Sequence, residues 1–286
     1  MERLSDIGVI KDLLTRHGFT FSKALGQNFL VNPSVCPRMA EYAVQSDNTG
    51  IIEVGAGVGV LTCELAKRAK KVVSVELDKR LLPVLDETLA EFPNAEVVND
   101  DIMKIDLNKL IEEKFQGMEV SVCANLPYYI TSPVIMRLLE SKLPLKRIVV
   151  MVQKEAADRL CAEVGSRESG AVTVAVNRYS VPRKLFTVSR GSFMPEPKVD
   201  SAVIELEIQE KTEFEGVDEK LFFSVVKAAF AQRRKTFVNA VSSGTNIDKG
   251  SIYKALEETG LPPTVRGEKL TMENLTNICR HLANEE

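Results

Sequence analysis

Short apolar runs alternate with amphipathic stretches over the first 208 residues of this chain. The apolar runs are rich in Val and Ile and are typical of buried strands. The stretches between them repeat apolar residues at helical spacing, as in 33–44 and 61–68. Strands are predicted at 51–54, 71–77, 95–99, 119–124, 147–153, 184–188 and 201–208. Such an alternation predicts an α/β fold with a largely parallel sheet.

The pattern changes after residue 208. Segment 209–217 is acidic and contains a glycine, which is typical of a linker. Helices are predicted beyond it at 221–231, 236–241, 249–259 and 272–282. These helices indicate a small all-helical C-terminal domain of roughly 75 residues. We therefore expect an N-terminal lead over 1–30, a sheet domain over 31–208 and a helical domain over 209–286.

One segment, 170–179, is ambiguous by pattern. Val172, Val174 and Val176 alternate as in a strand, and β-branched residues favour one. A helix is also compatible with these ten residues, and periodicity over so few positions does not decide between the two.

Charge is uneven along the chain, although the net charge is only −3. Residues 133–198 hold twelve Lys or Arg against six Asp or Glu, whereas 199–221 hold two against eight. A basic block of this kind suits a nucleic-acid partner. Composition alone would equally describe ordinary solvated surface.

The five cysteines are scattered and form no Cys-x-x-Cys pair. Together with the lack of a membrane-length apolar run and of an N-terminal signal pattern, this predicts a cytoplasmic protein with reduced thiols and no membrane partner. The chain has only two histidines, His17 and His281, so we expect no metal site.

A glycine-rich turn follows the first predicted sheet strand. Gly55, Gly57 and Gly59 would let the backbone turn tightly and let a ligand approach it. Glu76 lies 21 positions after Gly55, the spacing expected of a carboxylate that takes ribose hydroxyls. Adenosyl ligands and dinucleotides share this feature. Asp101 could accept a hydrogen bond from an adenine amino group, or could simply cap a helix before Ile102.

The run Asn125-Leu126-Pro127-Tyr128 ends the apolar strand at 119–124. An aromatic amine is a poor nucleophile because its lone pair is delocalised into the ring. The Asn125 side-chain oxygen and the Leu126 carbonyl could accept its two N–H groups, on a turn stiffened by Pro127. Tyr128 could stack on the base, which is worth roughly 1–3 kcal/mol. The alternative is an ordinary strand-to-loop turn with a core tyrosine.

Eight sequence blocks give the chain a specific resemblance to a known family. They occupy 25–30, 53–62, 75–78, 124–133, 151–155, 193–203, 230–240 and 266–275. In these blocks the chain resembles the small-subunit ribosomal RNA adenine N6-dimethyltransferases and, more distantly, the Erm resistance methylases. The resemblance implies a Rossmann-like class I methyltransferase with a seven-stranded sheet.

The resemblance also implies S-adenosylmethionine as methyl donor. Asn28 and Leu30 would close over its methionine end, Glu76 would hold the ribose, and Asp101 would hold the adenine amine. The residues implied to contact the donor are Asn28, Leu30, Gly55, Gly57, Glu76, Leu77, Asp101, Ile102 and Asn125.

The implied reaction places two methyl groups on N6 of each of two adjacent adenosines near the 3′ end of the small-subunit rRNA. The implied partner is the 30S precursor particle, met by a monomeric enzyme during ribosome biogenesis. Phe193 would cover the base opposite Tyr128, although it could instead be a core residue at a proline-rich bend. The target base must leave its stack for N6 to be reached.

Two parts of the chain qualify the resemblance. Ser169 stands where relatives commonly carry an aromatic residue, and the family pattern implies a helix over 170–179 against the local β preference.

Arg233, Arg234 and Lys235 are expected to contact phosphate. They could equally be a basic cluster at the C-terminal end of a helix, where the helix dipole favours positive charge.

Other functions remain as alternatives at this stage. The glycine turn and Glu76 permit a nicotinamide-dependent oxidoreductase, in which Asn125–Tyr128 would have no role. A ribosome-assembly factor without turnover would keep the fold, but intact Asn125 and Tyr128 argue against it. DNA N6-adenine methylases and protein-glutamine methylases use similar turns, and the eight blocks disfavour both.

Overall fold

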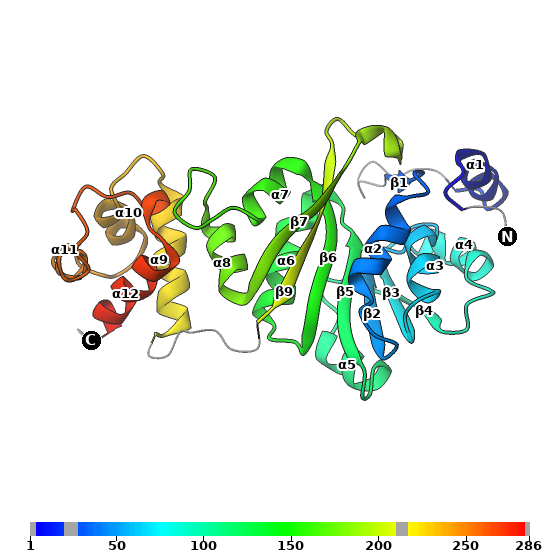
Figure 1. Ribbon diagram of the computed structural model, residues 1–286, viewed down its shortest axis with the longest axis horizontal. Coiled ribbons are helices and arrows are strands. Elements are labelled where there is room, and N and C mark those ends of the chain that lie inside the picture. The colour runs from blue at the N-terminus through cyan, green and yellow to red at the C-terminus, as the bar shows by residue number, and fades with distance from the viewer. Residues whose placement is uncertain (1–3, 20–27, 210–216, 284–286) are drawn as a thin grey trace. The chain divides into compact units, whose positions relative to one another are not determined.

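The computed structural model describes residues 4–19, 28–209 and 217–283 (Figure 1). The chain forms two compact units. The first comprises 1–157 and 181–208, and the second comprises 158–180 and 209–286. The break after Ile208 falls where the sequence pattern changes. Residues 158–180, however, pack with the helical unit, whereas our division from the sequence places them in 31–208.

The first unit is built on a seven-stranded sheet in the order β4-β3-β2-β5-β6-β9-β7. The strands are β2 (Thr49–Val54), β3 (Lys71–Glu76), β4 (Ala95–Asn99), β5 (Glu119–Asn125), β6 (Leu145–Gln153), β7 (Ser180–Val188) and β9 (Ser201–Ile208). Strands β4, β3, β2, β5 and β6 pair in parallel, and β9 pairs antiparallel to β6. The seven predicted strands and the α/β fold class are thus confirmed, with ends shifted by a few residues.

The helices up to residue 160 are α1 (Ile7–Arg16), α2 (Val35–Ala43), α3 (Val60–Ala66), α4 (Leu82–Thr88), α5 (Leu107–Lys114), α6 (Thr131–Glu140) and α7 (Lys154–Leu160). Helix α1 packs with α4 through a shared apolar core. Helices α2 and α3 pack on one face against Ile51, Val72 and Cys123. Their strand neighbours Ile52, Val73 and Val122 point to the other face and are fully buried as well, so both faces are covered.

A second, two-stranded sheet joins distant segments of this unit. β1 (Phe29–Leu30) pairs antiparallel with β8 (Phe193–Met194), so that Leu30 lies opposite Phe193. The backbone N–H of Val31 donates to the carbonyl of Ser192 at 2.8 Å, which extends the pairing. The sequence pattern did not predict these short strands because two residues carry no periodicity.

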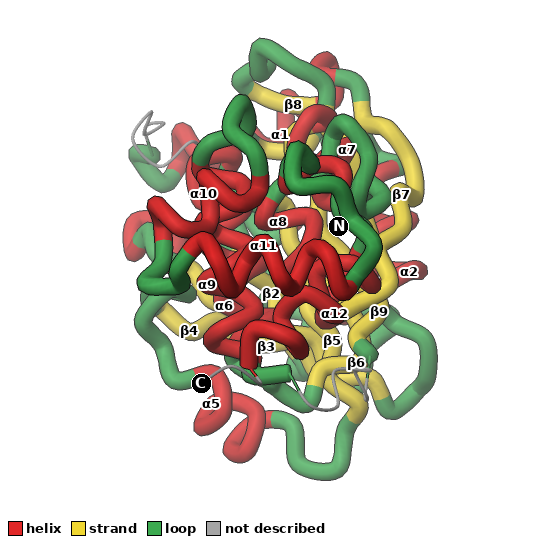
Figure 2. The backbone as a smooth tube through the Cα atoms, turned by 90° about the vertical axis from the view of Figure 1, so that its left-hand side faces the viewer, coloured by secondary structure: helices red, strands yellow, loops and turns green. Residues whose placement is uncertain are grey.

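The second unit is helical. Helices α8 (Ala171–Tyr179), α9 (Glu219–Ala231), α10 (Phe237–Gly244), α11 (Lys249–Glu258) and α12 (Met272–Ala283) make it up, and α9 to α12 pack on one another (Figure 2). Their shared core includes Phe222, Phe237 and Ile278. The four predicted helices are confirmed. Most of the predicted linker, 210–216, lies outside the described residues.

Segment 170–179 is a helix, as the family pattern implied. Val174 and Val176 are fully buried on α8, and Val174 belongs to the core that contains Phe222 of α9. The Thr173 hydroxyl accepts from the backbone N–H of Gly170 and donates to the carbonyl of Arg159, which fixes the start of the helix. Tertiary burial and this cap therefore override the β preference of the valines.

Glu53, the second-to-last residue of strand β2, is a fully buried carboxyl group. Its Oε2 accepts hydrogen bonds from the hydroxyl of Thr62 on α3, at 2.6 Å, and from the hydroxyl of Ser74 on β3. Burial raises the pKa of Glu53 to about 7, although these two bonds oppose the rise. Glu53 thus links two strands and a helix directly below the glycine-rich turn.

We predict that Glu53→Gln removes a pH dependence of stability. A pKa of about 7 in the folded protein, against 4.5 ordinarily, means that folding favours the protonated group. Stability from Glu53 therefore falls as pH rises from about 4.5 to about 7 and then stays level. The free energy of unfolding of Glu53→Gln, minus that of wild type, should rise by about 3 kcal/mol as pH increases across this window. Urea denaturation at a series of pH values measures both quantities.

Glu64→Gln is the matched control for this experiment. Although partial burial raises the pKa of Glu64, hydrogen bonds from Lys67 and Arg68 lower it below the ordinary value overall. The free energy of unfolding of Glu64→Gln, minus that of wild type, should therefore stay constant over the same pH window. A flat difference for Glu53→Gln as well would show that Glu53 is already ionised in the folded protein.

Candidate functional site

One cavity in the first unit gathers the residues that the sequence singled out. It opens where β2, β3 and β5 end, the edge at which open parallel sheets bind ligands. Its lining includes Asn28, Leu30, Gly55, Gly57, Glu76, Leu77, Asp101, Ile102, Asn125, Leu126, Pro127, Tyr128 and Phe193. The structure therefore brings together all residues that the sequence predicted to contact the methyl donor or the target base.

The glycine-rich turn runs from the end of β2 to the start of α3. Gly57 and Gly59 have φ angles of +60° and +90°, which L side chains rarely adopt. A Cβ on Gly59 would lie 2.8 Å from the Thr88 hydroxyl oxygen, and one on Gly57 would lie 3.3 Å from the Phe29 ring. Both positions therefore require glycine, for conformation and for space.

Glu76, the last residue of β3, is held by backbone donors. The N–H of Gly57 donates to its Oε2 at 3.0 Å, and the N–H of Asp78 donates to its Oε1 at 2.8 Å. The residue is only 6% exposed, and this burial raises the pKa of Glu76 while the two bonds oppose the rise. The carboxyl group is thus fixed in one orientation against the glycine turn.

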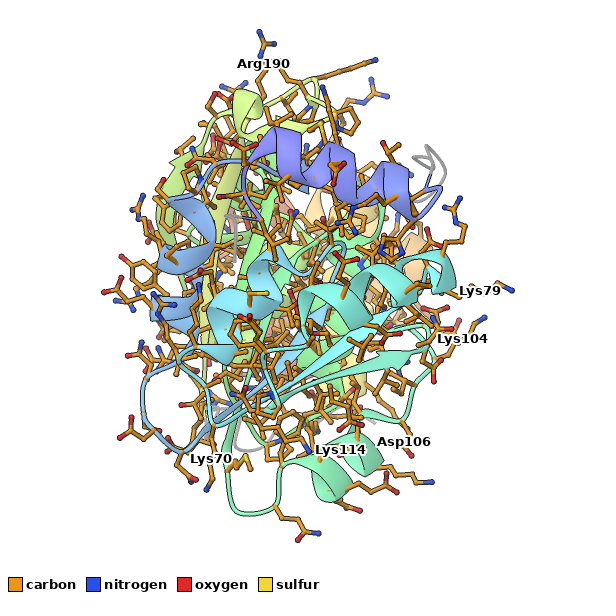
Figure 3. The ribbon with its side chains drawn as sticks, turned by 90° about the vertical axis from the view of Figure 1, so that its right-hand side faces the viewer. Lys70, Lys79, Lys104, Asp106, Lys114 and Arg190 are labelled. Carbon is orange, nitrogen blue, oxygen red and sulfur yellow. The ribbon has the colours of Figure 1, made fainter. Side chains whose placement is uncertain are left out.

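Asp101, two residues after the end of β4, caps a turn rather than a helix. Its Oδ1 accepts from the N–H of Met103 at 2.9 Å, which is a cap on the turn that follows. It also lines the cavity next to Ile102. Lys104, whose Nζ lies 3.7 Å from Asp101 Oδ2, extends outward on the same side of the sheet as Lys79 (Figure 3).

Arg137 on α6 braces the segment that carries Asp101. Its Nη1 donates to the carbonyl of Met103 at 2.5 Å and its Nη2 to the carbonyl of Ile105 at 2.6 Å. Helix α6 begins at Thr131, three residues after Tyr128, so one helix follows the Asn125–Tyr128 turn and also holds the segment after Asp101. Sequence reasoning missed Arg137, because nothing in the local pattern shows which carbonyls a guanidinium will reach.

Asn125 ends β5 and faces the N-terminal segment. Its Nδ2 donates to the backbone carbonyl of Asn28 at 3.4 Å, which leaves Oδ1 as the acceptor of the amide. The N–H of Leu126 donates to the carbonyl of Met151 at 3.2 Å. The carbonyl of Pro127 accepts from the N–H of Ile130 at 3.2 Å and from the Thr131 hydroxyl at 3.3 Å. The turn is therefore anchored on both sides.

Tyr128 is half-buried, and its hydroxyl lies 2.8 Å from Ser201 Oγ on β9. Burial raises the pKa of Tyr128 above its usual value of 10, so the phenol is neutral at physiological pH. Phe193 is 5% exposed, lines the cavity and packs in the same core cluster as Leu30. It is thus a core residue and a cavity wall at once.

The basic cluster of the second unit lies in the turn between α9 and α10. Arg233 is committed to internal contacts, because its Nη2 donates to the carbonyls of Arg167 and Ser169 and lies 3.3 Å from Glu268 Oε2. Arg234 and Lys235 are exposed. The structure therefore gives Arg233 a structural role beside any contact with phosphate.

The five cysteines are free thiols. Within the described residues, no group of His, Cys, Asp and Glu is arranged to hold a metal ion, and no helix is both long and apolar enough to span a membrane.

Comparison with known proteins agrees with this geometry. The family model described as ribosomal RNA adenine dimethylase matches residues 18–284. Ribosomal RNA small subunit methyltransferase A of Bacillus mycoides (strain KBAB4) is 46% identical over 276 residues, covering 95% of this chain and 94% of that protein. The protein of the same name from Alkaliphilus oremlandii (strain OhILAs) is 45% identical over 284 residues, with 99% of each chain covered.

Solved structures show the same fold. A dimethyladenosine transferase from Plasmodium falciparum matches with a TM-score of 0.71 at 25% identity, covering 87% of this chain and 95% of that one. The 23S rRNA methyltransferase ErmE matches with a TM-score of 0.69 at 25% identity, covering 90% and 100%. The nicotinamide-dependent alternative is thereby set aside. The chain belongs to the ribosomal RNA adenine dimethylase family and is an S-adenosylmethionine-dependent rRNA adenine dimethyltransferase with a Rossmann-like sheet.

Proposed function

We propose that this enzyme dimethylates N6 of two adjacent adenosines near the 3′ end of small-subunit rRNA, in a 30S precursor particle in the cytoplasm, and that it acts as a monomer. The name shared by its relatives, ribosomal RNA small subunit methyltransferase A, supports this choice of subunit. The observation that carries the proposal is the juxtaposition of Asn125–Tyr128 with Glu76 and Asp101 around one cavity.

The donor pocket fits an adenosyl ligand. Glu76, oriented by two backbone N–H groups, presents a fixed carboxyl group suited to the two ribose hydroxyls. Asp101 would accept from the adenine amine, with Leu77 and Ile102 as apolar contacts to the ring. The donor, when bound, supplies a methyl group from a positively charged sulfonium.

The N-terminal segment would close this pocket over the methionine end of the donor. Leu30 is held in β1 by its pairing with Phe193, and the carbonyl of Asn28 accepts from Asn125. Gly55 and Gly57 leave room for the ligand against the backbone. These contacts support the proposed donor residues Asn28, Leu30, Gly55 and Gly57.

Asn125–Tyr128 would capture the target amine. The Asn125 Oδ1 and the Leu126 carbonyl would accept the two N–H groups of adenine N6 and thereby turn its lone pair toward the methyl group. Tyr128, fixed by its bond to Ser201, would stack on one face of the base, and Phe193 would cover the other. Pro127 would keep the turn rigid. The neutral amine attacks the methyl carbon as the sulfur–methyl bond breaks, so no base is needed before the transfer. The donor would leave as a neutral thioether, and the extra proton on N6 would pass to solvent.

The sheet unit and the helical unit would have different roles in binding. The sheet unit would bind donor and target base, and Asn28 and Leu30 would close the pocket. The rest of the predicted lead over 1–30 includes residues 1–3 and 20–27, which lie outside the described residues. Residues 209–286 would contact the RNA backbone through the exposed Arg234 and Lys235 and, in part, through Arg233.

The substrate is tested with purified ribosomal particles. Small subunits from cells that lack this enzyme should accept labelled methyl groups, and mass analysis of the RNA should find N6,N6-dimethyladenosine at two adjacent positions. Large subunits serve as the comparison, since ErmE is named for 23S rRNA. Methylation of the large subunit alone would overturn the proposed substrate.

Asn125→Ala should lower methyl transfer about 100-fold or more, because one of two acceptors for the amine is lost. Donor affinity, measured by calorimetry, should fall by less than about tenfold. Asn108→Ala, on the exposed surface of α5, is the matched control and should leave both quantities unchanged. Near-normal turnover of Asn125→Ala would rule out its role as acceptor.

Arg137→Met should raise the KM for the donor about tenfold while changing kcat much less. Two backbone carbonyls beside Asp101 would lose charge-assisted bonds, each worth about 1.5–3 kcal/mol, and the adenine wall would loosen. Arg68→Met is the control, because Arg68 also donates to a backbone carbonyl, that of Glu64, but does not line the cavity. An unchanged donor KM would show that Arg137 does not position Asp101.

Arg234→Glu should weaken binding of the small-subunit particle and make its salt dependence shallower by about one unit of slope. Lys70→Glu is the control, because it makes the same change of charge just before β3, at a lysine that does not line the cavity. Binding measured over a series of salt concentrations distinguishes the two variants. An unchanged slope for Arg234→Glu would exclude a phosphate contact.

A further inference from the structure

Tyr129 is an aromatic side chain that the proposed mechanism does not use. It is 57% exposed, yet it lines the cavity. Among the exposed large apolar side chains of the described residues, only Leu77 shares this position, on the donor side. A large ring left in water at the mouth of a site is a typical anchor for a ligand that covers it on binding.

The backbone sets the direction of Tyr129. Tyr128, Tyr129 and Ile130 form a single 3₁₀ turn, η3, which the carbonyl of Pro127 caps by accepting from Ile130. Successive residues of such a turn point about 120° apart. The rings of Tyr128 and Tyr129 therefore cannot lie on the same face of one base. Tyr128 is committed inward by its bond to Ser201, and Tyr129 points elsewhere.

We propose that Tyr129 is the stacking platform for the base of the nucleotide next to the target adenosine. This inference rests on the proposed function, in which one adenosine enters the cavity and its neighbour stays outside. Extracting the target base breaks its stacking on that neighbour. The exposed ring of Tyr129 replaces the lost stacking at the mouth of the cavity.

Stacking suits a substrate with two adjacent targets. When either adenosine occupies the cavity, a different nucleotide lies at its mouth. Every base has a π-face, so a ring platform accepts whichever neighbour is present without reading its edge. A hydrogen-bonding contact would have to match two different neighbours.

The test compares Tyr129→Ala, Tyr129→Leu and Tyr129→Phe with wild type on small subunits. Tyr129→Ala and Tyr129→Leu should raise the half-saturating concentration of particles about 5- to 100-fold, the size expected for one lost stacking contact. Tyr129→Phe keeps the ring and should stay within about twofold of wild type. Donor affinity, measured by calorimetry without RNA, should be unchanged in all three. Tyr253→Ala, which removes a tyrosine that is 47% exposed on α11, is the matched control.

Three outcomes would overturn the inference. If Tyr129→Ala and Tyr129→Leu saturate like wild type, no base stacks there. If Tyr129→Phe loses as much as Tyr129→Ala, the hydroxyl and not the ring makes the contact. If donor affinity falls in parallel, Tyr129 belongs to the donor site. Wild-type enzyme that does not methylate small subunits would instead refute the proposed function, so the two failures are distinguishable.

Discussion

Parallel pairing on both sides of β2 is the constraint on which the rest of this molecule depends. β3 and β5 each pair in parallel with β2, so the carboxyl ends of three strands meet at one edge. Glu76 ends β3, Asn125 ends β5 and Gly55 follows β2. These three residues, up to 70 positions apart in sequence, thereby line one cavity, in which the proposed donor and target base would lie together.

Local electrostatics match a reaction between a sulfonium and a neutral amine. Three acidic residues, Glu76, Asp100 and Asp101, line the cavity together with Asn125. Backbone N–H groups hold Glu76 in place, and Tyr128 stays protonated because burial raises its pKa. In the proposed mechanism, positioning and stacking are the contributions of these residues to methyl transfer.

The rigidity of the site comes from residues behind it. Glu53 links β2, β3 and α3 under the glycine turn, Arg137 holds the carbonyls that follow Asp101, and Ser201 fixes Tyr128. Each of these side chains acts on a residue far away in the sequence. This is why sequence reasoning found the lining of the cavity but not its supports.

Strand positions and the helical C-terminal region followed from the sequence, because periodicity and glycine or proline turns are local features of a chain. Local turns also singled out Glu76, Asp101 and Asn125–Tyr128, whereas Asn28, Leu30 and Phe193 followed only from the family resemblance. Tertiary structure decided three matters. It made 171–179 a helix, since burial against α9 outweighs the β preference of its valines. It joined 158–180 to the helical unit. It also paired β1 with β8 and bonded Arg233 to the carbonyls of Arg167 and Ser169, since such contacts depend on which distant backbone groups the fold brings within reach.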